Sequence, residues 1–272
     1  MKTVYLFMVL IISYGCSHRP SGDSPKELPG SLAEAVKSDF RSPDNRQRDR
    51  YQHPLETLSF FGLKNNMTVI EVLPGSGYFT EILAFYLAQQ GHLLLAVSRM
   101  PLRPPRILIE NEMKIQDIML RHPLVQANTK LIPLELPDKR NRLQKESVDM
   151  IVTFNTIHNL VAKKSAAQTF KIFYQLLRRG GILGIVQHRV RKENKKVPKS
   201  GYMYEHEVIK LATAAGFRLQ ETSEINANLK DTADYPEGVW VLPPVYRLGD
   251  KDQRRFREIG ESDRMTLKFI RP

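Results

Sequence analysis

The chain has 272 residues, a length that suits one α/β domain with extensions or at most two small domains. Hydrophobic residues make up 42% of the sequence, which is enough for an ordinary core. An excess of 41 basic over 29 acidic residues gives a net charge of +12, and such a charge would suit nucleic acid, an anionic membrane or an acidic substrate. The basic residues are scattered and accompany no helix-turn-helix, zinc or aromatic RNA-binding signature, so we do not expect a nucleic-acid partner.

The N-terminus has the pattern of an export signal. Lys2 is followed by a continuous apolar run over residues 4–12, which has the length of a signal-peptide core and is short for a membrane span. Gly15 then precedes Cys16, the only cysteine in the sequence, which therefore has no partner for an internal disulfide. This order is similar to a bacterial lipoprotein signal. The similarity implies a signal peptide over residues 1–16, a lipid anchor on Cys16 and a location in the cell envelope, at the periplasmic face of the outer membrane.

The region after the signal divides into a tether and a folded domain. Residues 17–30 are rich in proline, serine and glycine, which is typical of a flexible linker. A capping box at residues 31–34 predicts the start of a helix, and Pro54 suits the first turn of a second one. We expect residues 31–65 to form an N-terminal helical lid on a domain that extends over residues 31–272.

Strand and helix patterns alternate through the rest of the chain. Apolar stretches predict strands at residues 67–73, 93–97, 130–134, 148–154, 182–186 and 265–270, and an alternating pattern predicts one at residues 217–225. Apolar residues at helical spacing predict helices over 105–120 and around 166–177 and 208–215, with Gly180-Gly181 ending the second of them. This alternation indicates a Rossmann-like, doubly wound α/β fold whose sheet is covered on both faces. An insertion at residues 226–250 precedes the last strand and contains the only tryptophan, Trp240.

The most informative segment is the turn after the first strand. An apolar run ends close to Glu71, a Gly75-Ser76-Gly77 turn follows, and a helical pattern of apolar residues begins at once. Glycines at such a turn let the backbone approach a ligand closely, and the helix N-terminus offers free N–H groups. We therefore expect a nucleotide-like ligand at this turn. The alternative is that the glycines serve the geometry of the turn alone.

The order of these elements resembles the class I S-adenosylmethionine-dependent methyltransferases. The resemblance covers about residues 55–272 and depends on residues 69–77 around the turn, residues 148–155 at the fourth strand and residues 176–183 with their Gly-Gly pair. The sequence most resembles a bacterial group of predicted methyltransferases whose substrate is unknown. The Arg-x-x-Tyr-x-His-Pro segment at residues 48–54 is a feature expected of that group. The resemblance implies a seven-stranded methyltransferase sheet, S-adenosyl-L-methionine as the cofactor, and methyl transfer to a small or envelope-associated acceptor.

The resemblance also implies roles for individual residues. The cofactor is expected to contact Glu71, Pro74, Gly75, Ser76, Gly77, Tyr78, Ser98 and Glu135. His158 is expected as a general base for the acceptor, with Asn155 and Asn159 positioning it. The residues expected to contact substrate are Tyr51, His53, His188 and Trp240. For each of these histidines and aromatic residues, the alternative is ordinary packing without a functional role.

Two positions depart from the family pattern. Leu73 replaces the first glycine of the usual Gly-x-Gly-x-Gly turn. Ser98 stands where the second strand usually ends in an acid that binds both ribose hydroxyls, and serine does not offer two charge-assisted hydrogen bonds. These departures favour an alternative, a binding lipoprotein of the same fold that transfers no methyl group; an envelope structural module is a third hypothesis.

No metal site is expected from the acidic cluster around His206. Glu205, His206 and Glu207 have the composition of a metal site, but adjacent residues on a helix do not converge on one point. A solvated start of a helix is the simpler interpretation of this cluster.

Overall fold

The structure is a computed structural model that describes residues 26–134, 143–191 and 201–272. The predicted signal peptide, Cys16, most of the tether and Glu135 lie outside these residues. Within the described part of the chain, no helix is both long and apolar enough to cross a bilayer.

A seven-stranded mixed sheet forms the centre of the fold, as predicted from the sequence. Its order is β3-β2-β1-β4-β5-β7-β6, and β7 is antiparallel to both of its neighbours. The strands are β1 (Thr68–Val72), β2 (His92–Val97), β3 (Thr129–Pro133), β4 (Val148–Phe154), β5 (Leu177–His188), β6 (Arg218–Ser223) and β7 (Arg264–Ile270). Because the strand order reverses between β1 and β4, the carboxyl ends of these two strands flank a crevice suited to a ligand.

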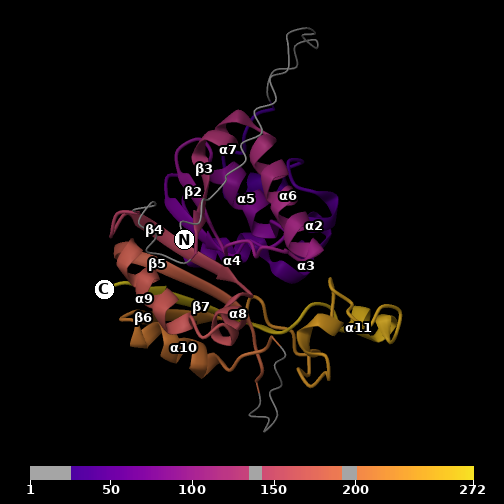
Figure 1. The fold of residues 1–272 in the computed structure, drawn as a ribbon. Helices are drawn as coiled ribbons and strands as arrows, with labels where there is room; N and C mark the ends of the chain where they lie inside the picture. Colours follow the sequence, from indigo (N-terminus) through magenta and orange to yellow (C-terminus); the bar gives the residue numbers. More distant parts are fainter. Residues whose placement is uncertain (1–25, 135–142, 192–200) are drawn as a thin grey trace, which may run out of the picture.

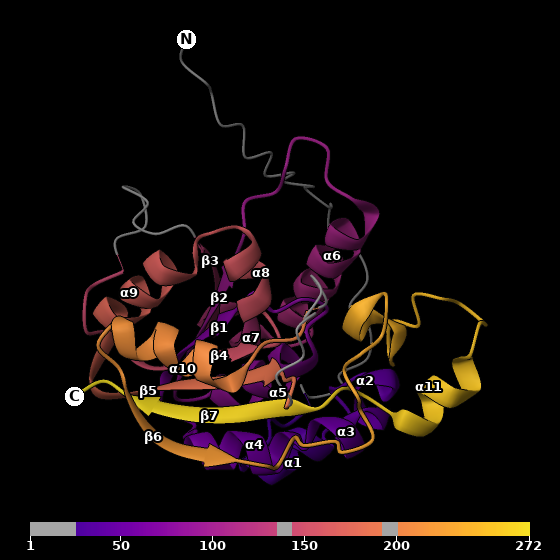
Figure 2. The ribbon, with the colours of Figure 1, turned by 90° about the horizontal axis from the view of Figure 1, so that it is seen from below.

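Helices cover both faces of the sheet (Figures 1 and 2). One face carries α1 (Leu32–Lys37), α4 (Pro54–Phe61), α5 (Tyr78–Leu87), α6 (Arg106–Leu120) and α7 (Pro123–Asn128). The other face carries α8 (Ile157–Ala162), α9 (Ala166–Leu176) and α10 (Glu205–Ala214). The remaining short helices are α2 (Pro43–Gln47), α3 (Asp49–Gln52), the 3₁₀ helix η1 (Gly238–Val241) and α11 (Gln253–Ile259).

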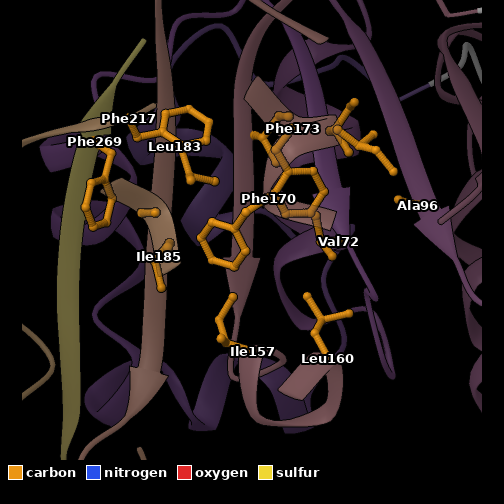
Figure 3. Close-up of a cluster of buried hydrophobic side chains, with 14 of the residues drawn as sticks. Val72, Ala96, Ile157, Leu160, Phe170, Phe173, Leu183, Ile185, Phe217 and Phe269 are labelled. Atoms are coloured by element: carbon orange, nitrogen blue, oxygen red, sulfur yellow. The ribbon is translucent and has the colours of Figure 1, made fainter. Parts of the chain in front are cut away.

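Neighbouring residues of the central strands contribute to two cores, one on each face of the sheet. In β1, Val69 packs on the side of α5, whereas Ile70 packs on the side of α9. Figure 3 shows the second core, where Phe170 and Phe173 of α9 lie over the sheet. Both phenylalanines are buried. Strands that are buried on both faces need continuous apolar runs, which is why their positions could be predicted.

The Gly180-Gly181 pair lies inside a strand and does not end a helix, contrary to the prediction. α9 ends at Leu176, and β5 begins with the next residue. The Gly180 N–H donates to the Arg271 carbonyl (2.8 Å), and the Arg271 N–H donates to the Gly181 carbonyl (2.9 Å). The glycines therefore continue the pairing of β5 with the chain that follows β7.

The N-terminal helical segment is attached to α5 through a buried carboxylate. Glu81 of α5 is 2% exposed. It accepts hydrogen bonds from the Ser42 N–H (3.1 Å), the Asn45 amide (2.8 Å) and the Arg121 guanidinium (2.9 Å). These bonds hold α2 beside α5 and next to the turn that follows β1.

Candidate active site

Two adjoining cavities lie at the carboxyl ends of the central strands. The larger one, of about 760 Å³, is lined by the turn after β1, the ends of β2 and β4, and one side of α6. The smaller one, of about 270 Å³, is lined by the ends of β4 and β5, by α8, and by the segments on either side of α11. Arg48, Asn155 and Asn159 line both cavities and form their boundary. This edge is where open α/β sheets bind ligands.

The turn after β1 exposes its backbone to the larger cavity at Gly75. Gly75 has a φ of +58°, and no atom lies within 4 Å of the position that its Cβ would take. Leu73 also has a positive φ, +52°, which costs a non-glycine residue roughly 1–2 kcal/mol. Gly77 faces the other way, because an added Cβ would lie 2.6 Å from Ile118 of α6. Gly75 is thus the glycine that faces the larger cavity, and Gly77 lets the turn pack on α6.

Tyr78 joins the turn to the N-terminal helical segment. Its hydroxyl donates to Asp49 (2.5 Å), which also accepts two hydrogen bonds from Arg41, each of 2.7 Å. The guanidinium groups of Arg41 and Arg48 lie 5.3 and 5.0 Å from the centre of the Tyr78 ring. These contacts make α3 and the residues before it a fixed wall of the site.

Glu71 brings a carboxyl group to the base of the larger cavity. It is 2% exposed and accepts a hydrogen bond from the Thr80 hydroxyl (2.7 Å). Burial raises the pKa of Glu71 from 4.5 to about 8, although the Thr80 hydrogen bond acts in the opposite direction. Glu71 is therefore mostly protonated at neutral pH, and a cation bound beside it would favour its ionised form.

The outer part of the larger cavity combines an apolar wall with a basic edge. The apolar side chains on this wall are Met100, Leu108, Ile115 and Leu131. At the end of β2, the Lys163 ammonium donates to the Ser98 hydroxyl (3.4 Å). Glu112 of α6 also lines the cavity, but its side chain is exposed. The apolar wall offers a surface for an apolar group, whereas position 98 supplies a hydroxyl and a neighbouring positive charge in place of an acid.

Two histidines and a tryptophan shape the smaller cavity. The rings of His158 and His188 lie 5.8 Å apart between centres, and Trp240 contacts His158 edge to face at 6.1 Å. Trp240, Pro243 and Pro244 supply an apolar wall opposite the ends of the strands. The cavity therefore has a polar side made by the sheet and an apolar side made by the segment before β7.

Burial keeps both histidines neutral. His158 Nδ1 lies 3.2 Å from Gln187 Nε2, and His188 Nδ1 lies 2.6 Å from the Ser262 hydroxyl. Burial lowers the pKa of His158 against the opposing effect of its hydrogen bond with Gln187. Burial lowers the pKa of His188 further, and the neighbouring His158 and Arg264 add to this effect. Neither ring is positively charged at neutral pH.

An ion pair between Arg48 and Glu261 stands at the boundary of the two cavities. Arg48 Nε donates to Glu261 Oε1 (2.7 Å), and Arg48 Nη2 donates to Glu261 Oε2 (3.3 Å). Glu261 also accepts hydrogen bonds from the Gln52 amide and from Arg264. The same wall is therefore built from the N-terminal segment and from the chain just before β7.

The structure brings most of the predicted site residues together. On the larger cavity lie Glu71, Pro74, Gly75, Ser76, Tyr78, Ser98, Asn155 and Asn159. On the smaller cavity lie Asn155, His158, Asn159, His188 and Trp240. Tyr51 and His53 line neither cavity: the Tyr51 ring packs beside Gly260, and His53 ends α3 in a left-handed conformation. The catalytic and binding roles expected of these residues stay predictions.

Several residues of the site were not predicted. They are Arg48, Gln52, Lys163, Gln187, Glu261 and Ser262. The partners among them are far apart in the sequence, as in the ion pair of Arg48 with Glu261, so no local pattern indicates them. The only available signals were the polar segment at residues 48–54 and the acidic segment before the last strand.

The fold is shared with several solved structures. A SAM-dependent methyltransferase from Aquifex aeolicus has a TM-score of 0.56 at 16% identity, covering 89% of this chain and 99% of that one. A geranyl diphosphate C-methyltransferase from Streptomyces coelicolor has a TM-score of 0.53 at 10% identity, covering 90% and 89%. The [4+2]-cyclase SpnF has a TM-score of 0.56 at 13% identity, covering 89% and 91%. No protein-family model and no curated protein matches the chain.

The chain has the Rossmann-like methyltransferase fold. Likeness at these identities establishes the fold and not the reaction, because a cyclase shares it with the two methyltransferases.

The buried carboxyl of Glu71 makes the free energy of unfolding depend on pH. Between pH 4.5 and about 8, the folded protein keeps a proton that the unfolded chain has lost, so stability falls as pH rises through this window and then levels off. Glu71→Gln cannot ionise. It should match the wild type at the acidic end and be more stable above about pH 8, by roughly 1.4 kcal/mol for each unit by which the pKa is raised. Urea unfolding at a series of pH values measures this difference.

Glu112→Gln is the matched control for this measurement. It removes an exposed carboxylate from the wall of the same cavity, and it should keep the pH slope of the wild type. The explanation fails if Glu71→Gln and the wild type show the same slope.

Proposed function

We propose that the protein is an S-adenosyl-L-methionine-dependent methyltransferase that acts on a small acceptor. The observation that carries this proposal is the pair of adjoining cavities, which share Arg48, Asn155 and Asn159. A methyl transfer needs two ligands whose reacting atoms meet, one in each compartment. The larger cavity has the volume of a nucleoside-sized ligand, and the smaller one suits a compact molecule.

The residues of the larger cavity fit the cofactor. Glu71 would hold its ammonium group, and the bond with Thr80 already orients that carboxyl. Gly75 leaves the space that a close approach of the backbone requires, and Arg48 and Gln52, both bonded to Glu261, line the same cavity. The apolar wall on α6 would cover its adenine ring. A geranyl diphosphate C-methyltransferase of the same fold was crystallised with S-adenosyl-L-homocysteine.

Methyl transfer depends mainly on the alignment of the acceptor with the methyl group of the cofactor. The bound cofactor supplies a methyl group that is already activated by its sulfonium. The protein then has to hold the acceptor in line with that group and exclude water. Asn155 and Asn159 stand at the boundary where alignment matters, and Trp240 with Pro243 and Pro244 covers the far side of the acceptor cavity. These residues would position the acceptor without forming a bond to it.

A second candidate is a binding protein that uses the same fold without methyl transfer. The observation that favours it is the basic edge of the larger cavity, where Lys163 bonds to Ser98 in place of a ribose-binding acid. A ligand with an anionic group would suit this edge as well as a ribose does. Binding of the cofactor distinguishes the two candidates.

Gly75→Arg should abolish binding of S-adenosyl-L-methionine, because position 75 faces open space in the larger cavity and a long side chain there would occupy it. Calorimetric titration of the wild type should show binding in the micromolar range, about −8 kcal/mol. Gly249→Arg is the matched control, since Gly249 has a nearly equal φ of +60°, is also open, and lies away from both cavities. A wild type that binds nothing at millimolar cofactor would leave only the second candidate.

Ser98→Asp should strengthen binding of the cofactor. An aspartate at the end of β2 can accept hydrogen bonds from both ribose hydroxyls, and charge-assisted hydrogen bonds are stronger than neutral ones. We expect about tenfold tighter binding, equivalent to about 1.4 kcal/mol. Ser98→Asn, which has the same shape without the charge, is the control. If Ser98→Asp binds no more tightly than Ser98→Asn, the ribose does not lie at this edge.

We also propose that the mature protein is lipid-anchored through Cys16 and acts at the cell envelope. The support is the N-terminal pattern of Lys2, the apolar run at residues 4–12 and a single cysteine. Several acyl chains on one residue hold a protein firmly on a membrane. Cys16→Ser should abolish labelling by a radioactive fatty acid and move the protein out of the lipoprotein fraction. Unchanged labelling would show that Cys16 is not the anchor.

A further inference from the structure

The orientation of the Gln187 side chain determines which ring nitrogen of His158 carries a hydrogen. Gln187 is completely buried near the end of β5. Its Oε1 accepts a hydrogen bond from the Ile157 N–H (3.0 Å), and its Nε2 donates to the Gly201 carbonyl (3.0 Å). A reversed amide would place donor against donor and acceptor against acceptor in a buried position, and both hydrogen bonds would be lost. The NH₂ group of Gln187 therefore points in one direction only.

This NH₂ group also determines the tautomer of His158. Gln187 Nε2 lies 3.2 Å from His158 Nδ1. Because Nε2 of the amide is a donor only, Nδ1 of the ring must accept and must carry a lone pair. A neutral imidazole with a lone pair on Nδ1 has its hydrogen on Nε2. The His158 ring on the wall of the cavity is thus an N–H donor, and its lone pair is already used by Gln187.

The two charged side chains that line the smaller cavity are paired with each other. They are Arg48 and Glu261, and no other described residue of the lining has a permanently charged side chain. The rest of the lining is apolar, amide, hydroxyl or neutral imidazole. The cavity has a volume of about 270 Å³. Such a cavity favours a small ligand without a net charge.

We infer that His158 is a hydrogen-bond donor that orients the acceptor, and that the acceptor is a small, uncharged, largely apolar molecule with a heteroatom that accepts the Nε2–H. This inference rests on the proposed function and specifies its second ligand. It differs from the role of general base that the sequence suggests for His158. An acceptor whose reacting atom carries a proton has to lose it to water or to another group. Gln187 acts through His158 and is a positioning residue.

Nitrogen NMR tests the tautomer directly. In the full-length ¹⁵N-labelled protein, the His158 ring should show a lone-pair nitrogen at Nδ1 and a protonated nitrogen at Nε2, assigned by the loss of these signals in His158→Phe. Gln187→Glu should move the proton to Nδ1, because a carboxylate can only accept. If this variant does not fold, the wild-type spectrum still decides. A proton on Nδ1 of the wild type would overturn the inference.

Two ring probes of equal size test the ligand chemistry. Pyridine offers one acceptor and no donor, and benzene offers neither; both are uncharged above the pKa of pyridine. Wild-type protein should bind pyridine roughly threefold to tenfold more tightly than benzene, in line with one neutral hydrogen bond. His158→Phe should lose this preference. His92→Phe should keep it, because His92 is exposed at the opposite end of β2.

The results separate this inference from the proposed function. Equal binding of the two probes by the wild type, or a preference for pyridine that survives in His158→Phe, would refute the donor role. Neither measurement needs S-adenosyl-L-methionine. The protein could show the Nε2–H tautomer and prefer pyridine but bind no cofactor. In that case the donor role of His158 would stand and the proposed methyltransferase function would be wrong.

Discussion

The ion pair of Arg48 with Glu261 is the contact on which the architecture of the site depends. It joins residues at opposite ends of the sequence and closes the wall between the two cavities. Glu261 is 5% exposed, and it is also held by Gln52 and Arg264. Removing Glu261 would leave both Arg48 and the buried Arg264 without their carboxylate, and an uncompensated buried charge costs about 3–5 kcal/mol. The N-terminal helical segment is therefore part of the site and not an appendage to the sheet.

Backbone strain marks the point where the central strands leave the sheet. Leu73 after β1 and Asn155 after β4 both have positive φ values, of +52° and +58°. Each is held there by a hydrogen bond to the next strand, from the Leu73 N–H to Ala96 and from the Asn155 N–H to Val186, both of 2.8 Å. Asparagine tolerates this conformation and leucine does not. The two paired strands thus end beside each other at the edge of the sheet where the larger cavity lies.

The sheet was predictable because its signal is local, whereas the site was predictable only in part. The buried strands give apolar runs, the exposed edge strand β6 gives an alternating pattern, and the turn after β1 has a glycine pattern of its own, so all seven strands and this turn could be predicted. The short helices α7, α8 and α11 have too few apolar positions to show a period. The direction of the Tyr51 side chain, which packs beside Gly260, could not be predicted because it depends on how α3 lies against the chain before β7. The sequence shows Gln187 only as a polar residue in an apolar strand. Its role depends on contacts with Ile157, Gly201 and His158, which come from other segments of the chain.

The distribution of charge between the cavities is consistent with the reaction proposed for them. Glu71 can ionise next to a bound cation, so the larger cavity suits a positively charged ligand. The smaller cavity has neutral histidines and a paired arginine. When a neutral acceptor attacks a sulfonium, the positive charge spreads over both molecules in the transition state. A dispersed charge loses less hydration than a concentrated one on entering an apolar site, so a neutral, largely apolar acceptor cavity favours the transition state over the separated reactants. A charged acceptor would forfeit that advantage, because its own desolvation would have to be offset by a partner that the paired side chains of the cavity do not offer.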